Sequence, residues 1–375
     1  MLRSRYIMIG GFLGAGKTTA ILKLAERYTA EGLRVGLITN DQSIGLVDTT
    51  ILASHGFPTQ EISGGCFCCK FNSLVEASER LQADSRPDVF LAEPVGSCTD
   101  LVATVSYPLQ TMYGDAYRVA PLSVMLDPIR AQRILGLRRG RAFTPKVRYI
   151  YSKQMEEADL LVINKTDLID EEQQGELYAA LEQAYPQASV LAISARTGDG
   201  IEVWMEAIVA EAACKRRAME IDYDTYADGE ALLGWVNVAV DLTTADVQST
   251  FDGNRLLGAL VERIGLQVDK SGSGQIEIAH LKATLKPSQG NDLAVANLVR
   301  GDTSPELSHH LAEPLSKGDL ILNLRAEGDP DLLRETTLGV LRRIAEEFRL
   351  TLAFQHAESF RPARPTPTYR LSENR

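Results

Sequence analysis

The stretch from Gly11 to Thr18 has the residue types and spacing of a phosphate-binding loop, Gly-x4-Gly-Lys-Thr. Its glycines let backbone N–H groups turn inward around phosphate oxygens, and the start of the following helix adds a partial positive charge. Lys17 is placed to reach the β- and γ-phosphates, and the Thr18 hydroxyl is placed to hold Mg²⁺. The predicted phosphate contacts are Gly11, Gly14, Ala15, Gly16, Lys17, Thr18 and Thr19.

A second motif, Asn-Lys-Thr-Asp at 164–167, concerns the choice of base. Its Asp carboxylate can accept both guanine donors, the ring N–H and the exocyclic amine, whereas adenine would leave that carboxylate partly unpaired. Its Asn would complement O6 or N7 of the purine, and the stem of its Lys would pack on the ring. A strand-end turn stabilised by Asn and Asp is the alternative interpretation. The predicted base contacts are Asn164, Lys165, Asp167, Ser194 and Ala195.

Two carboxylates follow apolar runs that we expect to be strands. Asp41 lies after Val35–Thr39, and Glu93 lies after Asp88–Ala92. Ligands bind beyond the carboxyl ends of parallel strands, so both carboxylates can reach Mg²⁺ or the attacking water. Gly96 can bring a backbone N–H to the γ-phosphate and so sense hydrolysis. We predict that Lys17, Asp41 and Glu93 are catalytic and that Thr18, Asp41 and Glu93 hold Mg²⁺, with Asp41 as a simple loop cap being the alternative.

Three thiols are clustered at Cys66, Cys68 and Cys69, directly after Gly64-Gly65. In an extended strand Cys68 and Cys69 would point to opposite faces, so convergence requires a loop, which the glycines allow. Three thiolates are soft ligands suited to Zn²⁺, Cu(I) or Co²⁺, and an open fourth position suits a metal that is passed on. Buried structural cysteines and a redox dithiol are the alternatives. Cys98 is a candidate further ligand, or another buried thiol.

Apolar runs alternate with helical patterns through the first half of the chain, at 6–9, 35–39, 88–92, 159–163 and 189–193. This alternation predicts an α/β fold, a P-loop NTPase parallel sheet with helices on both faces. The strand and helix patterns of the second half predict a smaller α+β domain that is split βαβ-like. We expect a GTPase domain at 1–214, a linker at 215–230, a C-terminal domain at 231–360 and a disordered, Pro-rich tail at 361–375.

The net charge and the apolar content of the sequence argue against some classes of binding partner. The net charge of −11 argues against wholesale binding of nucleic acid or anionic membrane, and the sequence has no long apolar run that would span a bilayer. The phosphate loop lies too near the start of the chain to leave room for a signal peptide, and clustered cysteines favour a reducing compartment, so we expect a cytoplasmic protein. The basic stretch at 130–153 is either a docking surface for an acidic partner or a solvated helix face, and one of its arginines could stabilise the transferring phosphoryl group.

The segments GGFLGAGKTT at 10–19, GGCFCC at 64–69 and NKTD at 164–167 together resemble the CobW-like branch of P-loop GTPases, relatives of the hydrogenase and urease nickel-insertion GTPases. The resemblance implies a GTP-binding and GTP-hydrolysing metallochaperone that uses GTP with Mg²⁺. It implies that Zn²⁺ or Co²⁺ binds at the Cys-x-Cys-Cys motif and is delivered to a client metalloprotein whose identity is unknown. Pairing into a homodimer is an analogy with the broader class.

Two departures from the family pattern concern the segments that would move on hydrolysis. The usual Asn-Asp/Glu-Phe-Gly is replaced by Asn-Asp-Gln-Ser at 40–43, and the usual Glu-Thr-Thr-Gly by Glu-Pro-Val-Gly at 93–96. The client and the switching details therefore stay open. A GTP-gated activator of a metal- or corrinoid-dependent enzyme, with structural cysteines, is the second hypothesis, and a small-molecule phosphotransferase is the third.

Overall fold

The structure is a computed structural model that describes residues 3–40, 47, 51–52, 55–210, 218–246, 248–271, 276–290 and 292–372. The chain groups into two compact units, which we describe separately. The first unit comprises Met1–Ile44, His55–Gly229 and Arg364–Arg375, and the second comprises Gly45–Ser54 and Glu230–Ala363. This grouping differs from the boundaries expected from sequence because it assigns the end of the chain to the first unit.

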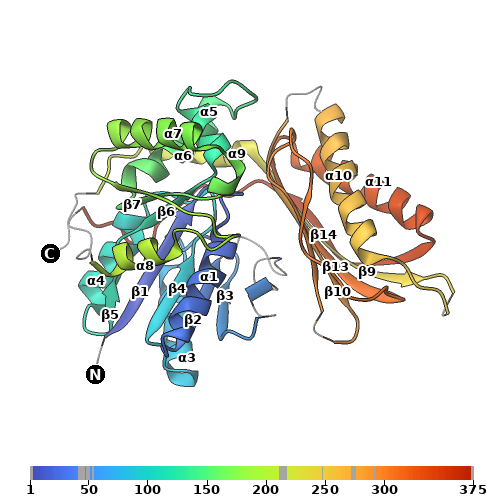
Figure 1. Ribbon diagram of the computed structural model, residues 1–375, viewed down its shortest axis with the longest axis horizontal. Helices are drawn as coiled ribbons and strands as arrows, with labels where there is room; N and C mark the ends of the chain where they lie inside the picture. The colour runs from blue at the N-terminus through green and yellow to red at the C-terminus, as the bar shows by residue number, and fades with distance from the viewer. Residues whose placement is uncertain are drawn as a thin grey trace. The chain divides into compact units, whose positions relative to one another are not determined.

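The first unit is built on a parallel sheet flanked by helices, and the predicted α/β fold is confirmed (Figure 1). The strand order is β3-β2-β4-β1-β6-β7-β8, with β5 also paired to β1. Its strands are β1 (Ser4–Gly11), β2 (Val35–Asn40), β3 (Thr59–Ile62), β4 (Val89–Glu93), β5 (Tyr117–Val119), β6 (Ser123–Leu126), β7 (Leu160–Ile163) and β8 (Ser189–Ala192). Its helices are α1 (Lys17–Ala30), α3 (Phe71–Asp84), α4 (Tyr107–Tyr113), α5 (Pro128–Ile134), α6 (Pro145–Glu157), α7 (Glu171–Ala184), α8 (Ile201–Ala210) and α9 (Tyr223–Leu232), with short η1 (Val102–Ser106) and η2 (Thr166–Leu168).

Several of these strands have apolar sequences because they are buried on both faces. Every residue of β2, β4, β6 and β7 is buried, as expected for strands covered on both faces by helices. The sequence did not predict β3, β5 or β6. The last of these matters most, because β6 lies between β1 and β7 and so places the residue that follows it beside the phosphate loop.

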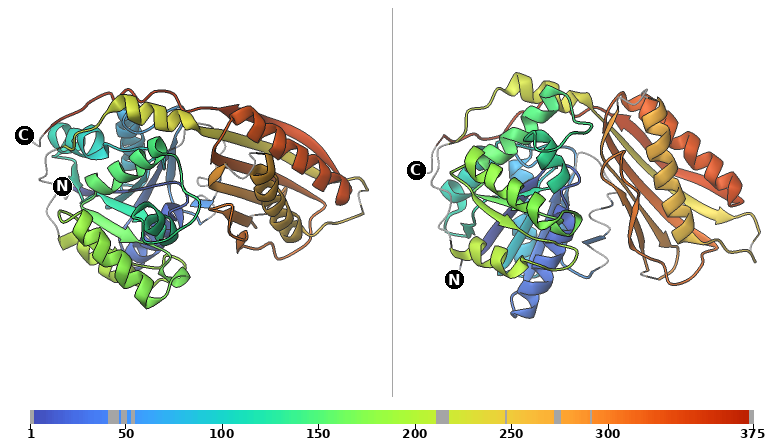
Figure 2. Two further views of the ribbon diagram at one scale, coloured as in Figure 1. Left: turned by 90° about the horizontal axis from the view of Figure 1, so that it is seen from above. Right: turned by 45° about the horizontal axis from the view of Figure 1, so that its top comes forward.

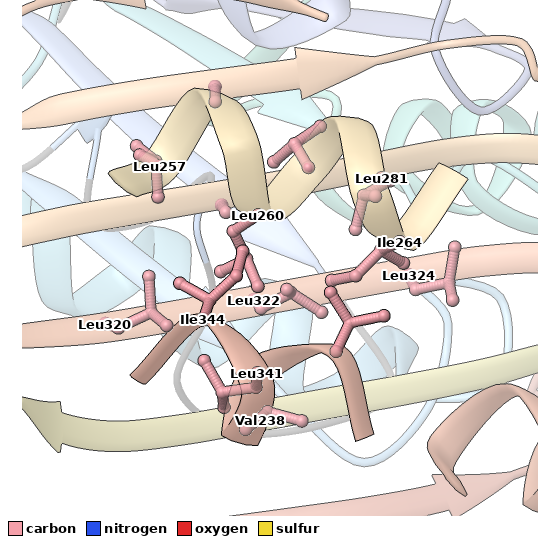
Figure 3. Close-up of a cluster of buried hydrophobic side chains, with 14 of the residues drawn as sticks. Val238, Leu257, Leu260, Ile264, Leu281, Leu320, Leu322, Leu324, Leu341 and Ile344 are labelled. Carbon is pink, nitrogen blue, oxygen red and sulfur yellow. The ribbon is translucent and has the colours of Figure 1, made fainter. Parts of the chain in front are cut away.

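The second unit is an antiparallel sheet with strand order β12-β11-β10-β13-β9-β14. Its elements are β9 (Leu233–Thr244), α10 (Gly253–Ser271), β10 (Glu277–Pro287), β11 (Ala294–Leu298), β12 (Glu306–His309), β13 (Lys317–Glu327), α11 (Pro330–Glu347) and β14 (Leu350–Phe360). Both helices lie on one face of this sheet (Figure 1). Leu257 and Leu260 of α10 and Leu341 of α11 meet alternate residues of the strands, such as Leu320 and Leu322 (Figure 3). Period-2 strands facing amphipathic helices thus form one apolar core.

The sequence predicted a disordered tail at 361–375, and the structure describes this segment as far as Ser372. The dark red C-terminal segment runs across the first unit in Figure 2. It forms backbone hydrogen bonds, among them Leu371 N–H to Ala103 O (2.9 Å) and Ala218 N–H to Ser372 O (3.1 Å). The tail therefore has a defined path over the first unit. Among the described residues, we find no helix long and apolar enough to cross a membrane.

Candidate nucleotide and metal site

The phosphate loop connects β1 to α1. Gly16, the residue before α1, has φ +91°, and a Cβ built there would lie 2.4 Å from Asn164 Nδ2. Only glycine avoids both the strained backbone and that clash. No side chain caps the start of α1, which is the end of a helix where an anion is favoured. The loop therefore has the conformation that phosphate binding requires.

Lys17, Thr18 and Glu93 converge at the base of this loop, and all three are buried. Lys17 Nζ donates to Gly11 O (2.9 Å) and lies 4.0 Å from Glu93 Oε1. The Thr18 hydroxyl donates to the same carboxylate oxygen at 3.2 Å. A hydroxyl and a carboxylate at this separation fit the pair of oxygen donors that Mg²⁺ takes in P-loop proteins. Asp41, predicted to be a third member, lies outside the described residues.

Gly96 lies against the phosphate loop from the β4 side. A Cβ at this position would come within 3.0 Å of Leu13 N, so a larger residue would displace one of the two segments. Gln154 of α6 holds the segment by donating from Nε2 to Gly96 O (3.0 Å) and Cys98 O (2.8 Å). Gly96 therefore lies beside the phosphate loop, and its contact with the γ-phosphate stays a prediction.

The predicted base contacts surround the other end of the loop. Asn164 Nδ2 donates to Ala15 O (2.9 Å), and its Oδ1 accepts from Ala195 N–H (3.0 Å). Lys165 Nζ donates to Gly14 O (2.6 Å). Asp167 accepts from the Ser194 hydroxyl (2.6 Å) and is paired with Arg196. The two predicted segments are therefore brought together, while Thr19 is exposed on the first turn of α1.

Sequence reasoning missed Asp127, which directly follows β6. Its Oδ2 accepts from Lys165 Nζ (3.0 Å), and its Oδ1 caps α5 by accepting from Arg130 N–H (3.0 Å). The available signal was Asp-Pro at 127–128, since Asp before Pro is a typical helix start. Asp127 therefore orients the lysine expected to pack on the base.

Arg130 is the member of the basic stretch that lies at the phosphate loop. Its guanidinium donates to Leu13 O (3.0 Å) and lies 5.6 Å from the Phe12 ring centroid and 4.8 Å from that of Phe143. Lys146 and Lys153 of the same stretch instead form ion pairs with acidic side chains on the surface. Arg130 is therefore an arginine of this stretch that contacts the phosphate loop.

The three clustered thiols converge in a turn. Cys66 Sγ lies 2.8 Å from Cys68 Sγ and 3.2 Å from Cys69 Sγ, and the last two sulfurs are 3.7 Å apart. Cys69 N–H and Lys70 N–H both donate to Cys66 O, at 3.0 and 2.9 Å, which closes the turn. The sulfur atoms all lie within 4.8 Å of one another. This geometry suits a soft metal ion held by three sulfur ligands.

The hydrogen bonds among the three thiols give them different pKa values. Hydrogen bonds with Cys68 and Cys69 lower the pKa of Cys66, whereas the bond with Cys66 raises the pKa of Cys69 to about 11. The pKa of Cys68 is raised by the same contact with Cys66. One thiolate is thus stabilised by neighbours that stay protonated, because adjacent like charges repel. Three thiolates require a bound cation, which fits a metal site.

Asn40 and Cys98 also support the cysteine loop. Asn40, the last residue of β2, donates from Nδ2 to Ile62 O (2.9 Å) and Gly65 O (2.7 Å), so it holds the backbone that leads into Cys66. The buried Cys98 thiol hydrogen bonds with Cys66 and Cys68. The sequence did not predict this holding role of Asn40. The end of β2 therefore holds the backbone before Cys66, and Cys98 of the segment after β4 contacts the thiols.

Comparison with curated proteins finds partial matches. A zinc chaperone CobW from Sinorhizobium sp is 30% identical over 182 residues, which is 44% of this chain and 51% of that protein. A zinc chaperone YeiR from Escherichia coli is 35% identical over 94 residues, 25% of this chain and 28% of that protein. The chain thus spans about half the length, or less, of these relatives.

Solved structures with a similar fold include HypB from Helicobacter pylori in complex with nickel, at 18% identity and a TM-score of 0.41, covering 56% of this chain and 86% of that one. Zn(II)-bound YjiA GTPase from E. coli is 15% identical, with a TM-score of 0.34, covering 91% and 99% of the two chains. The family described as CobW/HypB/UreG, nucleotide-binding domain, matches residues 5–192, half of the 375-residue chain. The chain therefore belongs to the CobW/HypB/UreG nucleotide-binding domain family.

Proposed function

We propose that this protein hydrolyses GTP and couples hydrolysis to delivery of a transition metal, Zn²⁺ or Co²⁺, from Cys66, Cys68 and Cys69 to a client metalloprotein. The observation that carries the proposal is the convergence of three thiols in a loop that is held by the end of β2 and touched by the segment after β4. Those two segments also carry the residues expected to respond to the γ-phosphate. Metal affinity can therefore depend on the nucleotide.

Guanine selectivity rests on Asp167 with its neighbours. Ser194 holds the carboxylate from one side, and Asn164 is fixed between Ala15 O and Ala195 N–H. A preset carboxylate accepts both guanine donors without further ordering, which favours GTP over ATP.

Hydrolysis is assigned to residues around the phosphate loop. Lys17 stabilises charge on the β- and γ-phosphates, and Arg130 contributes positive charge at Leu13. Thr18 and Glu93, with Asp41, would hold Mg²⁺, which neutralises phosphate charge when it is bound. Gly96 and Asp41 belong to the segments whose positions would change when the γ-phosphate leaves.

Metal binding and nucleotide binding are then thermodynamically linked. If GTP changes the affinity for the metal by some factor, the metal changes the affinity for GTP by the same factor. Thiols that bind a metal must stay reduced, which supports action in the cytoplasm.

As a second candidate function, this protein is a GTP-gated activator of a metal- or corrinoid-dependent enzyme. In that case the cysteines of this chain are structural. The deep burial of Cys66 and Cys68, 5% and 1% exposed, supports this alternative. Under it, replacing Cys66 and Cys69 together by Ala would lower folding stability without a loss of metal transfer.

The deciding experiment is an anaerobic titration of the reduced protein with Zn²⁺ and Co²⁺, with and without a non-hydrolysable GTP analogue, while thiolate–cobalt charge transfer is recorded. We expect one tightly bound metal per chain, lost in Cys66→Ala/Cys69→Ala, and an affinity that shifts with the nucleotide. Equal affinity in the GTP- and GDP-bound states would disprove the coupling. Absence of a thiolate signal in either state would favour the activator.

A further inference from the structure

The last residues of the chain lie on the cysteine loop, and their sequence explains how. In Pro365-Thr-Pro-Thr368 the prolines lack an N–H and restrict φ, so only the threonines can donate from the backbone. Thr366 N–H donates to Cys69 Sγ at 3.2 Å, and Thr368 N–H donates to Cys68 O at 2.8 Å. The Thr368 hydroxyl donates to Cys69 O at 3.1 Å. The backbone N–H groups of both threonines therefore donate to the cysteine turn.

A buried carboxylate anchors the same segment. Arg370 donates to Asp100 through Nε (2.7 Å) and Nη2 (3.3 Å), and Asp100 also accepts from the Tyr223 hydroxyl (2.6 Å). Asp100 is only 1% exposed and has φ +65°, an uncommon conformation for a residue other than glycine. A two-pronged Arg–carboxylate contact is among the stronger side-chain interactions, and its loss would leave the buried carboxylate short of a partner.

An aromatic contact lies between these two attachments. Tyr369 meets Phe71 edge to face, with ring centroids 5.4 Å apart and an interplanar angle of 87°. Phe71 is fully buried and begins α3, directly after the cysteine turn. The C-terminal segment therefore contacts the sulfur of one thiol, the backbone of the turn and the first residue of the following helix.

We propose that residues 364–372 form a strap that positions the cysteine loop for metal binding, with Thr366 and Arg370 as its positioning residues. The inference rests on the proposed metal-handling function of the thiols. A backbone N–H aimed at Cys69 Sγ fixes the direction of that sulfur. Outer contacts of this kind typically change metal affinity by about 10- to 100-fold. Because Asp100 follows Gly96 closely in the chain, the strap also ties the thiol turn to the segment expected to sense the γ-phosphate.

The most direct test removes one hydrogen-bond donor, the backbone N–H of Thr366. Thr366→Pro removes the donor to Cys69 Sγ and suits an extended, Pro-rich segment, whereas Thr366→Ala keeps the N–H and loses only the hydroxyl contact with Arg364 O. We expect Thr366→Pro to weaken Co²⁺ and Zn²⁺ binding roughly tenfold and to alter the cobalt charge-transfer band. The loss in Thr366→Ala should stay below about twofold. Equal affinities for both variants and the wild type would overturn the role of this N–H.

A second experiment tests whether Arg370 anchors the strap, with a nearby arginine as the control. Arg370→Ala should weaken metal binding roughly tenfold and speed metal release to a chelator, while GTP affinity is retained. Arg361→Ala is the control, because Arg361 contacts Ala231 O and Asp329 within the second unit. Identical metal release from both variants would contradict the strap.

A measurement on metal-free protein separates failure of the strap from failure of the proposed function. Hydrogen–deuterium exchange at the amides of Thr366 and Thr368 should be slow in the wild type and fast in Arg370→Ala. Fast exchange in both proteins would overturn the strap whether or not the thiols bind metal. If the wild-type protein binds no metal while these amides are protected, the metal-handling function fails and the strap persists as a structural attachment only, which overturns its positioning role.

Discussion

The phosphate loop and the cysteine loop are both short, glycine-containing turns, but they are held in different ways. The phosphate loop is held by segments that follow the buried strands β6 and β7, with Arg130 donating to Leu13 O and Asn164 donating to Ala15 O. The cysteine loop is held by Asn40, the last residue of β2, and also by Thr366, which lies outside the described helices and strands. Supports that follow buried strands are fixed by the sheet. A support outside regular structure can move more readily, which suits a site that must release its ligand.

The largest expected effect is on the phosphate loop. Lys17→Ala should lower GTP hydrolysis by about 10³-fold or more, because the charge that stabilises the transferring phosphoryl group is lost. Metal binding by the nucleotide-free protein and the fold should be retained, since the three thiols belong to a separate turn. Lys23→Ala, which removes an exposed ion pair with Glu26 on the same helix, is the control. Single-turnover assays would check this, and retained turnover would mean that the phosphate loop is misassigned.

The second prediction tests base selection in the same region. Asp167→Asn should weaken GTP binding by about 100-fold and improve XTP binding, because the amide complements the exocyclic carbonyl of xanthine. Competition between GTP and XTP in one titration provides the internal control. Unchanged selectivity would place guanine recognition elsewhere.

The third prediction tests the distant support of the cysteine loop. Asn40→Ala removes the two donors to Ile62 O and Gly65 O and should weaken metal binding about tenfold by loosening the approach to Cys66. Asn254→Ala is the matched control, since Asn254 holds a loop of the second unit through Leu311. If the two variants bind Co²⁺ equally well, Asn40 does not position the thiols.

The smallest effect concerns Glu157, which holds the segment shared by both sites by accepting from the Thr99 hydroxyl and Val102 N–H. Burial, with a further contribution from Asp100, raises its pKa from 4.5 to about 8. Between these values the native carboxyl holds a proton that the unfolded chain has lost, so its stabilisation is full below pH 4.5 and is lost as pH rises through about 8.

Glu157→Gln should remove this pH dependence. The melting temperature of the metal-free variant should match that of the wild type near pH 5 and exceed it by a few degrees near pH 9. The exposed neighbour Glu156, paired with Lys153, supplies the control Glu156→Gln. Parallel melting curves for Glu157→Gln and the wild type across this range would refute the assignment.

The local sequence pattern was sufficient to predict the two nucleotide motifs of the first unit and the strands that precede them. Residues 11–18 and 164–167 are contiguous motifs, and the apolar runs before them have the burial that makes a parallel strand recognisable. The strand β6 was missed because its four residues show no periodicity that distinguishes a strand from a loop. Asp127 was therefore missed with it.

The tail shows where composition misleads. Its few apolar residues and many prolines predict disorder, since such a segment cannot bury enough surface to offset its ordering. The structure supplies partners that composition does not reveal, namely a thiol, two carbonyl groups of the cysteine turn and the buried Asp100.

Residue types and spacing alone already predict the chemistry of this chain: a phosphate loop, a base-selecting motif, three soft ligands and a parallel sheet whose strand ends bring them together. Contacts between residues far apart in the sequence decide the rest. Only folding shows that Arg130 contacts the phosphate loop, that Asn40 holds the cysteine turn and that the segment around Thr366 lies on this turn. The physical reason is that hydrogen bonds and ion pairs depend on distance and direction in space, which local periodicity does not encode.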